Sequence, residues 1–386
     1  MASTFNIPAT VMIGAGASNE LANQLRRLEV RRVLVVSDPY LVDSGVVARL
    51  LEPLASTAIA ATVYAGVRPD PTVQNVRDGL QRFRESEAEA VVAIGGGSPI
   101  DAAKAIAILS RNPEPLADYM GYHKIPRAGV PLVAIPTTAG TGSEVTKVAV
   151  ITDEQRNLKM MILDAHLLPS VALVDYELTL TMPAPLTAHV GVDTLTHGIE
   201  AFVSRKATAM TDPIALSCIR LVSRHLASAW EEPTNRVARE GMMLAATQGG
   251  MAFANSSVCL VHGMSRPLGA VFHIPHGLSN AMLLPCVTKF SLAGAEPRYA
   301  LVAREMGLVT ADHPDRSAAE RLVGELVRLN DRLRVPRIRD YPGISQHEFE
   351  RSLEKMANDA LASGSPANNP VVPSAAEIVQ LYRDAW

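Results

Sequence analysis

The first 180 residues alternate short runs rich in Val and Ile with segments of helical periodicity, and no other feature constrains the fold as strongly. Helical patterns cover residues 73–85 and 99–109, for example. The strand candidates are residues 31–38, 62–67, 89–97, 129–138 and 169–176. Strands that alternate with helices are typical of a parallel sheet with helices on both faces. We therefore predict a mostly parallel α/β sheet for this half of the chain.

The pattern changes near residues 179–188. After this point apolar residues recur every three or four positions over long stretches, which indicates amphipathic helices, and strand candidates are few. With 386 residues, 48% of them hydrophobic, the chain is long enough for two sizeable cores. We predict an α/β domain over residues 1–180 and an all-α domain over residues 181–386.

Composition excludes several classes of protein. The net charge is −3, without the basic excess typical of nucleic-acid binders. No apolar run reaches the roughly 18 residues of a membrane span. The first residues lack the pattern of a secretory signal. Three scattered cysteines argue against a disulfide framework and for a reducing compartment. We expect a cytoplasmic protein whose partner is a small molecule, with no nucleic acid and no membrane.

A glycine-rich turn follows the third strand candidate, in the segment IGGGSPIDAAKAIA that begins at Ile94. Glycines let the backbone approach a ligand closely, and the N–H groups at a helix start suit a phosphate. The spacing matches neither the P-loop nor the Gly-x-Gly-x-x-Gly pattern, and Lys104 is too far along to be a P-loop lysine. A phosphate site and a plain strand–helix turn both fit this turn.

Two further features favour a nucleotide. The strand RVLVVSD ends in Asp38, where an acid can accept hydrogen bonds from ribose hydroxyls and repel a 2′-phosphate, which favours NAD over NADP. A helix-capping aspartate explains Asp38 equally well. The loop PTTAGTGSE, residues 136–144, places hydroxyls and glycines directly after a strand. Such a loop can hold phosphate or the nicotinamide end of the cofactor.

Asp193 and His197 stand four residues apart in GVDTLTHGIEAF, a stretch that otherwise resembles a buried helix. Four helical residues turn about 400°, so the two side chains lie roughly 40° apart on one face. This arrangement suits two ligands of one metal, although an Asp–His hydrogen bond along the helix explains it too.

Three more histidines, His262, His273 and His276, fall within fifteen residues of apolar sequence. Buried imidazoles are costly unless each has a partner. One carboxylate with two or three imidazoles is a suitable ligand set for ferrous iron or zinc. Core histidines with hydrogen-bond partners are the alternative. Taken with Asp193, the spacing favours a metal site.

The motifs resemble those of the iron-containing (group III) alcohol dehydrogenases. The matching segments are GGGSPIDAAKAIA, IPTTAGTGSEVT, VGVDTLTHGIEAF, VHGMSRPLGA and IPHGLSNAMLLP. They occur in order, from about residue 5 to the C-terminus. The resemblance implies a dinucleotide-binding α/β domain and an all-α metal-binding domain, in a dehydroquinate synthase-like architecture with the active site in the cleft.

Carried over position by position, the resemblance also implies site residues. Fe(II), or Zn(II) in its place, would bind Asp193, His197, His262 and His276. The NAD contacts would be Asp38, Gly95, Gly96, Gly97, Ser98, Asp101, Thr137, Thr138, Ser143 and Lys159. Asp101 either contacts the cofactor or caps its helix. Because they hold the metal that activates the substrate, Asp193 and His262 also count as catalytic residues.

One departure from the family pattern concerns proton transfer. The family usually has His-Pro or His-Gln where this chain has Arg266-Pro267. Arginine stays charged and is a poor acid or base at neutral pH. His273 is then the candidate proton relay, with a supporting or packing role as its alternative. Arg266 either binds an anionic group of the substrate or pairs with a nearby acid.

The function implied is a metal-dependent alcohol dehydrogenase, or aldehyde or ketone reductase, that transfers hydride between an alcohol and NAD(H). The family commonly forms homodimers or larger assemblies. Alternatives are a reductase of an anionic carbonyl substrate of the maleylacetate or hydroxy-acid type and a zinc glycerol dehydrogenase-like enzyme. A more remote alternative is a non-catalytic metal- or nucleotide-binding protein. We expect Cys259 to be a buried structural thiol and not a nucleophile.

Overall fold

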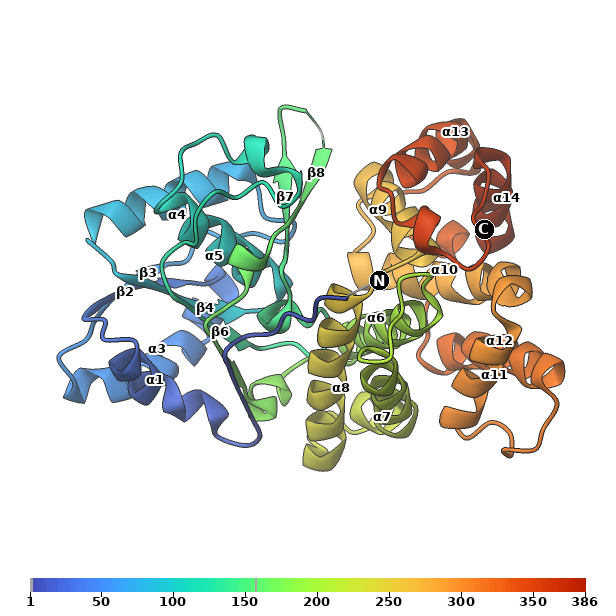
Figure 1. Ribbon diagram of the computed structural model, residues 1–386, viewed down its shortest axis with the longest axis horizontal. Helices are drawn as coiled ribbons and strands as arrows, with labels where there is room; N and C mark the ends of the chain where they lie inside the picture. The colour runs from blue at the N-terminus through green and yellow to red at the C-terminus, as the bar shows by residue number, and fades with distance from the viewer. Residues whose placement is uncertain (1–2, 157) are drawn as a thin grey trace. The chain divides into compact units, whose positions relative to one another are not determined.

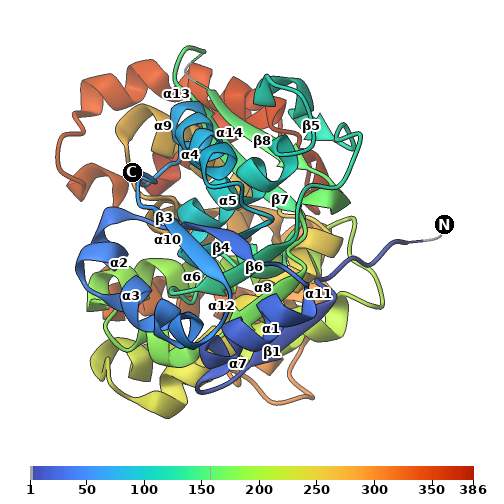
Figure 2. The same ribbon diagram turned by 90° about the vertical axis from the view of Figure 1, so that its left-hand side faces the viewer.

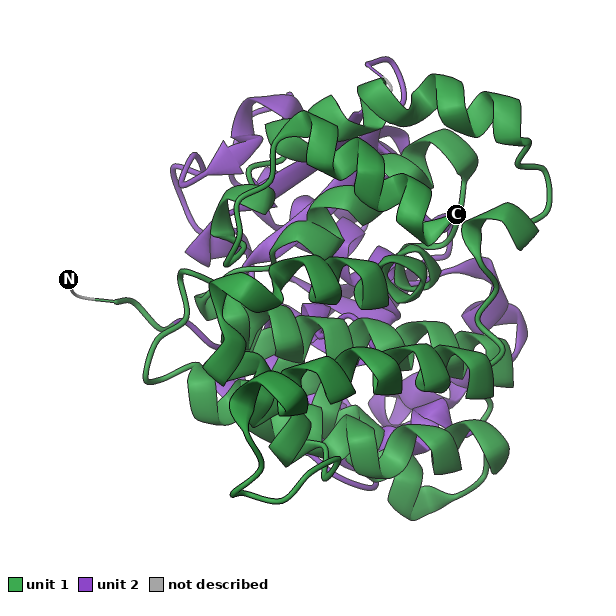
Figure 3. Ribbon diagram, turned by 90° about the vertical axis from the view of Figure 1, so that its right-hand side faces the viewer, with its two compact units in different colours: residues 1–5, 181–386 green, residues 6–180 purple. Residues whose placement is uncertain are grey.

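The computed structural model describes residues 3–156 and 158–386, which form two compact units (Figure 3). One unit comprises residues 6–180. The other comprises residues 181–386 together with residues 1–5.

A six-stranded parallel sheet forms the centre of the 6–180 unit, in the order β1-β9-β6-β4-β2-β3. The central strands are buried almost throughout, as expected for apolar runs covered on both faces. The strands are β1 (Thr10–Ile13), β2 (Arg32–Val36), β3 (Ala60–Tyr64), β4 (Ala90–Gly95), β6 (Leu132–Pro136) and β9 (Val171–Val174).

Helices cover both faces of this sheet (Figure 1). The helices of the unit are α1 (Leu21–Arg27), α2 (Pro39–Asp43), α3 (Val46–Leu51), α4 (Val73–Glu85) and α5 (Gly97–Leu109). Alternate residues of β2 point to opposite faces, so Leu34 packs in the core with α4 and α5, and Val33 packs with α1 and α3. A capping box between Thr72 and Asn75 fixes the start of α4.

A second, three-stranded sheet lies in the same unit and was not among the sequence predictions (Figure 2). Its strands are β5 (Gly121–Tyr122), β7 (Val148–Asp153) and β8 (Leu158–Leu163). β7 and β8 pair antiparallel, and the residues of β7 alternate between half-buried and buried.

The other unit is helical, without a strand among its described residues. Its helices are α6 (Ala184–Val203), α7 (Asp212–Glu231), α8 (Arg236–Asn255), α9 (Leu260–Phe272), α10 (His276–Ser291), α11 (Glu296–Glu305), α12 (Asp315–Arg332), α13 (Gln346–Ala362) and α14 (Ala375–Ala385). The predicted fold class, a parallel α/β part followed by an all-α part, is confirmed. Among the described residues, no helix combines the length and apolarity needed to cross a bilayer.

Helix α6 occupies the centre of the packing around the candidate site. It packs against α7, α8 and α10, and α9 packs against α10. Residues 191–203 of α6 are all buried, polar ones included. The beginnings of α9 and α10 carry two of the predicted metal-binding histidines, His262 and His276.

Candidate functional site

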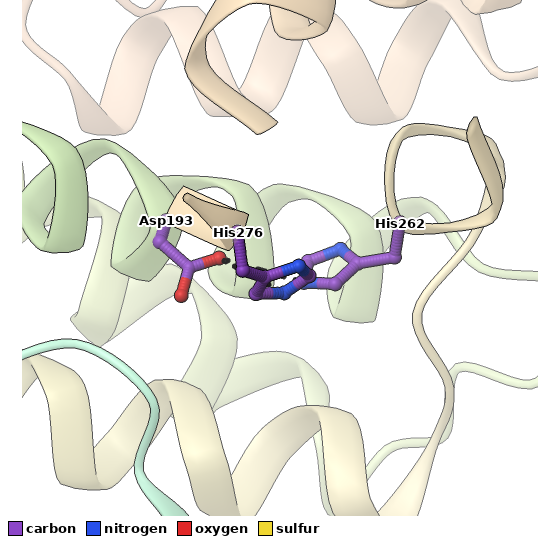
Figure 4. A group of neighbouring side chains, drawn as sticks. All are labelled: Asp193, His262 and His276. Carbon is purple, nitrogen blue, oxygen red and sulfur yellow. Dashed lines mark ion pairs between the residues drawn. The ribbon is translucent and has the colours of Figure 1, made fainter. Parts of the chain in front are cut away.

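Three side chains from three helices of the helical unit point toward one another (Figure 4). Asp193 lies on α6, His262 near the start of α9, and His276 at the first position of α10. Their ligand atoms all lie within 4.8 Å of one another. The Oδ1 atom of Asp193 is 3.5 Å from Nε2 of His262 and 3.9 Å from Nε2 of His276. The side chain of His276 is 40% exposed, so the cluster is accessible on that side.

His197 lies beside this cluster, one helical turn after Asp193. Its Nε2 atom is 3.8 Å from Oδ1 of Asp193. The imidazole ring stacks on that of His262, with ring centres 4.7 Å apart, and on Phe253, with ring centres 4.3 Å apart. The side chain is therefore held next to the three others, and its role as a fourth ligand stays a prediction.

The electrostatics of the cluster favour a cation. Burial alone would raise the pKa of Asp193, but the imidazoles of His197, His262 and His276 hold that pKa below its ordinary value. Burial likewise opposes a charge on His262, but Glu200 and Asp193 outweigh it and raise the pKa of His262. Burial lowers the pKa of His276 to about 3, so that imidazole stays neutral. An ionised carboxylate beside a neutral imidazole is suited to a divalent ion.

Two polar side chains that the sequence analysis did not single out border the cluster. The Nδ2 atom of Asn280 donates to Oδ1 of Asp193 at 2.6 Å and lies 3.1 Å and 3.2 Å from Nε2 of His262 and His276. Glu200 lies against the opposite side of the His262 ring, 2.6 Å from Nδ1. Helical spacing was the available signal, because Asn280 lies four residues after His276, and Glu200 lies seven after Asp193.

The predicted cofactor residues belong to the other unit, and Asp38, Gly95, Thr137 and Thr138 lie at the carboxyl edge of its parallel sheet. Strands β6, β4 and β2 are neighbours, so their carboxyl ends lie side by side. The backbone N–H of Thr137 donates to Gly95 at 3.0 Å, and the hydroxyl of Ser37 donates to the carbonyl of Ile94 at 2.8 Å. In open α/β sheets, ligands bind at this edge.

The glycine turn leads directly into α5. Gly96 is the N-cap residue, and Gly96, Gly97 and Ser98 are half-buried, so this helix start is open to a ligand. A β-carbon on Gly97 would lie 2.9 Å from a methyl carbon of Thr141. A larger residue at this position would therefore force Thr141 of the neighbouring loop to shift.

A buried polar network joins α5 to that loop. One carboxylate oxygen of Asp101 accepts from the hydroxyl of Ser143 at 2.6 Å, and the other accepts from the N–H of Val150 at 2.9 Å. Nζ of Lys104 donates to Ser143 at 2.9 Å. Burial lowers the pKa of Lys104 to about 8, although Asp101 and Glu144 oppose the shift. Asp101 and Ser143 thus hold the loop, and their contact with a cofactor stays a prediction.

Asp38 and Lys159 each have a partner within the protein. Oδ1 of Asp38 accepts from the N–H of Leu41 at 2.9 Å and caps α2. Lys159 lies on β8 of the three-stranded sheet, where its Nζ is 2.7 Å from Oδ1 of Asp70. Asp38 caps α2 and still lies at the carboxyl end of β2, which is the position where an acid could bind the adenosine ribose. The cofactor roles of both residues stay predictions.

Arg266 lies within α9, and His273 is the C-cap residue of the same helix. His273 is exposed and follows the helix in the left-handed conformation, with φ of 55°. Nη1 of Arg266 donates to the hydroxyl of Ser365 at 2.9 Å. The proton-relay role of His273 and the substrate role of Arg266 stay predictions.

Cys259 is buried, and burial, with Glu200, raises the pKa of its thiol well above the ordinary value, as expected of a structural cysteine.

Residues 8–176 match the family model described as iron-containing alcohol dehydrogenase, and residues 187–386 match the model of that family's C-terminal part. The chain belongs to the iron-containing alcohol dehydrogenase family. The resemblance carried by the five motifs is thereby confirmed.

Several proteins of known function or structure are similar to this iron-containing alcohol dehydrogenase over almost its full length. It is 34% identical to the NAD-dependent methanol dehydrogenase of Bacillus methanolicus, covering 99% of this chain and 100% of the relative. It is 36% identical to the lactaldehyde reductase of Escherichia coli (strain K12), covering 100% of both. A crystal structure of 1,3-propanediol oxidoreductase superposes with a TM-score of 0.96 at 35% identity, covering 100% of both chains.

Proposed function

We propose that this protein is a metal-dependent alcohol dehydrogenase, or aldehyde or ketone reductase, that transfers hydride between an alcohol and NAD(H). The observation that carries the proposal is the convergence of Asp193, His262 and His276 in the helical unit. The family match, and the reactions named for the relatives, support the same class of reaction on a CH–OH group.

The residues of the cluster fit a divalent metal. A carboxylate oxygen and imidazole Nε2 atoms are ligands that Fe(II) and Zn(II) both accept, and the family is the iron-containing one. Asp193, His262 and His276 would hold the ion, with His197 as the proposed fourth ligand. When bound, the ion supplies Lewis acidity toward the substrate oxygen, and the nicotinamide supplies the hydride acceptor or donor.

The protein's own side chains contribute charge, orientation and access. Ionised Asp193 offsets part of the positive charge of the ion. Asn280, which donates to Oδ1 of Asp193, keeps that carboxylate turned toward the histidines. The substrate would approach from the exposed side of His276. His273, exposed at the end of α9, is our proposed proton relay.

The nucleotide would be held in the other unit. The open N-terminus of α5, at Gly96, Gly97 and Ser98, offers backbone N–H groups to the pyrophosphate. Gly95, Thr137 and Thr138 line the same edge of the sheet in our proposal. Asp38, at the end of β2, would bind the adenosine ribose.

A metal analysis followed by activity assays tests the proposal. We expect protein purified without oxygen to contain stoichiometric iron or zinc. In the presence of this metal, NADH absorbance should report turnover with small neutral alcohols and aldehydes. The same panel should include anionic aldehydes and keto acids, because a preference for them would favour the alternative in which Arg266 binds the substrate. Metal-free protein, or no turnover across the panel, would contradict the proposal.

Replacing Asp38 by glycine should relax the preference for NAD. The carboxylate of Asp38 would repel the 2′-phosphate of NADP, and such a pair of like charges costs several kcal/mol. Because about 1.4 kcal/mol corresponds to a tenfold change in an equilibrium constant, the ratio of kcat/KM for NADP to that for NAD should rise by about tenfold or more. Asp38→Asn is the matched variant, because it removes the charge and keeps an acceptor for the N–H of Leu41. An unchanged ratio in both variants would restrict Asp38 to capping α2.

From the resemblance we also propose a cytoplasmic homodimer or larger assembly. The three cysteines form no disulfide, which supports a reducing compartment. Sedimentation of the purified protein measures the assembly state directly.

A further inference from the structure

Glu200 is a buried carboxylate, near the end of α6, that three donors from α9 and its N-cap share. Its side chain is 3% exposed. Oε2 accepts from the N–H of Cys259 at 2.9 Å and lies 2.6 Å from Nδ1 of His262. Oε1 accepts from the N–H of Val261 at 2.6 Å. One side chain thus fixes both the backbone at the start of α9 and the imidazole that this helix carries.

The contact with Nδ1 decides which nitrogen of His262 is available to a metal. A carboxylate can only accept from Nδ1, so the proton of the neutral ring resides there, and Nε2 keeps its lone pair. Nε2 is the atom that lies 3.5 Å from Oδ1 of Asp193. Glu200 therefore turns the ligand atom of His262 toward the cluster.

One face of α6 carries three of the side chains involved. Asp193, His197 and Glu200 stand at positions i, i+4 and i+7, which share a face of a helix. The helix thereby places one predicted ligand, a second ligand candidate and the carboxylate that orients a third.

We propose that Glu200 is a positioning residue of the metal site, which sets metal affinity by holding His262 in the Nδ1-protonated form with Nε2 toward the ion. The inference rests on the proposed metal-dependent function, but that function could be correct without any role for Glu200. Carboxylates that bind the far nitrogen of a ligating histidine typically contribute about 10- to 100-fold to metal affinity.

A glutamine at this position cannot reproduce the contacts. Three donors converge on two oxygens, and an amide offers only one oxygen and presents N–H groups on the other side. If the amide oxygen faces Cys259 and His262, its nitrogen opposes the N–H of Val261. If it faces Val261, its nitrogen opposes the donor on His262. Glu200→Gln therefore tests the carboxylate with little change of shape.

The matched control is Asp175→Asn in the other unit. Asp175 is also buried, and it also accepts three hydrogen bonds on two oxygens, from the N–H and hydroxyl of Ser18 and from the N–H of Glu177. This variant reproduces the loss of a buried capping carboxylate without touching the metal cluster. Any loss of stability common to both variants is thereby separated from metal binding.

The experiment is competition for Zn²⁺ between metal-free protein and a chromophoric chelator. We expect Glu200→Gln to weaken Zn²⁺ binding by about 10- to 100-fold and Asp175→Asn to leave it unchanged. Equal affinity in Glu200→Gln and wild type would overturn the inference and leave the proposed function intact. Failure of the wild-type protein to bind Zn²⁺ or Fe²⁺ would instead overturn the metal site, and the inference with it.

A second measurement needs no variant at Glu200. In wild-type protein loaded with Zn²⁺, spectra of ¹⁵N-labelled histidine should show His262 protonated at Nδ1 and not at Nε2. The signal is assigned by its absence from His262→Gln. Protonation of His262 at Nε2 would overturn the inference even if Glu200→Gln does not fold.

Discussion

Replacement of His262 by alanine is expected to remove bound metal and dehydrogenase activity together. The imidazole is buried, and its Nε2 lies 3.5 Å from Oδ1 of Asp193, so its loss removes one of the three converging ligand atoms. Lewis-acid stabilisation is worth several kcal/mol, and each 1.36 kcal/mol is tenfold in rate, so kcat/KM should fall by about 100- to 10,000-fold. Metal content by elemental analysis and turnover by NADH absorbance are measured on the same preparation.

His347→Ala is the control for the loss of a histidine. His347 is exposed on α13, and its removal should leave both metal content and turnover unchanged. If His262→Ala retained stoichiometric metal with full turnover, His262 would be removed from the ligand set. If it retained metal but lost turnover, His262 would act on the substrate and not on the ion.

Replacement of Lys104 by methionine is expected to lower the free energy of unfolding by about 3–5 kcal/mol, the usual loss when one partner of a buried ion pair is removed. Lys104 is completely buried. Its ammonium donates to Ser143, Thr146 and the carbonyl of Val148 at 2.7–2.9 Å and lies 3.8 Å from Oδ1 of Asp101. Methionine fills a similar volume but leaves these acceptors without a donor and the carboxylate without its counter-charge.

Urea unfolding separates this effect by unit. Both tryptophans, Trp230 and Trp386, belong to the helical unit, so their fluorescence follows that unit, whereas circular dichroism follows both. The exposed pair Lys355–Asp359 provides the control, because Lys355→Met should cost less than about 1 kcal/mol. Adding Asp101→Asn to Lys104→Met should recover part of the loss. A loss below about 1 kcal/mol in Lys104→Met would show that the buried pair contributes little to stability.

The parts of the fold that depend on local sequence patterns were predictable from the sequence. The helix predicted over residues 73–85 has those bounds in the structure. It was predictable because its capping box and its apolar face both depend on residues close together in the sequence. The glycine turn between β4 and α5 was visible for the same reason. The β7–β8 pair was missed, although the burial of β7 alternates, since strands of six residues beside turns give a weak periodic signal.

The candidate site was only partly predictable. Asp193 and His197 share a helix, so their spacing already indicated a common face. Glu200 meets its partners 59 to 62 residues further along the chain, and no local pattern encodes that distance. The sequence shows only that Lys104 is too far along to be a P-loop lysine. Its role in joining α5 to the following loop depends on tertiary packing, which no local pattern indicates.

All the predicted metal ligands reside on α6, α9 and α10 and thus within a single compact unit, whereas the glycine turn lies in the other. Nucleotide exchange, which must occur in every catalytic cycle, therefore requires no protein–metal bond to break. Binding of the metal and exchange of the nucleotide thus involve separate units of the chain. Molecules that lack the ion should then stay inactive however much nucleotide is supplied, until the metal is restored.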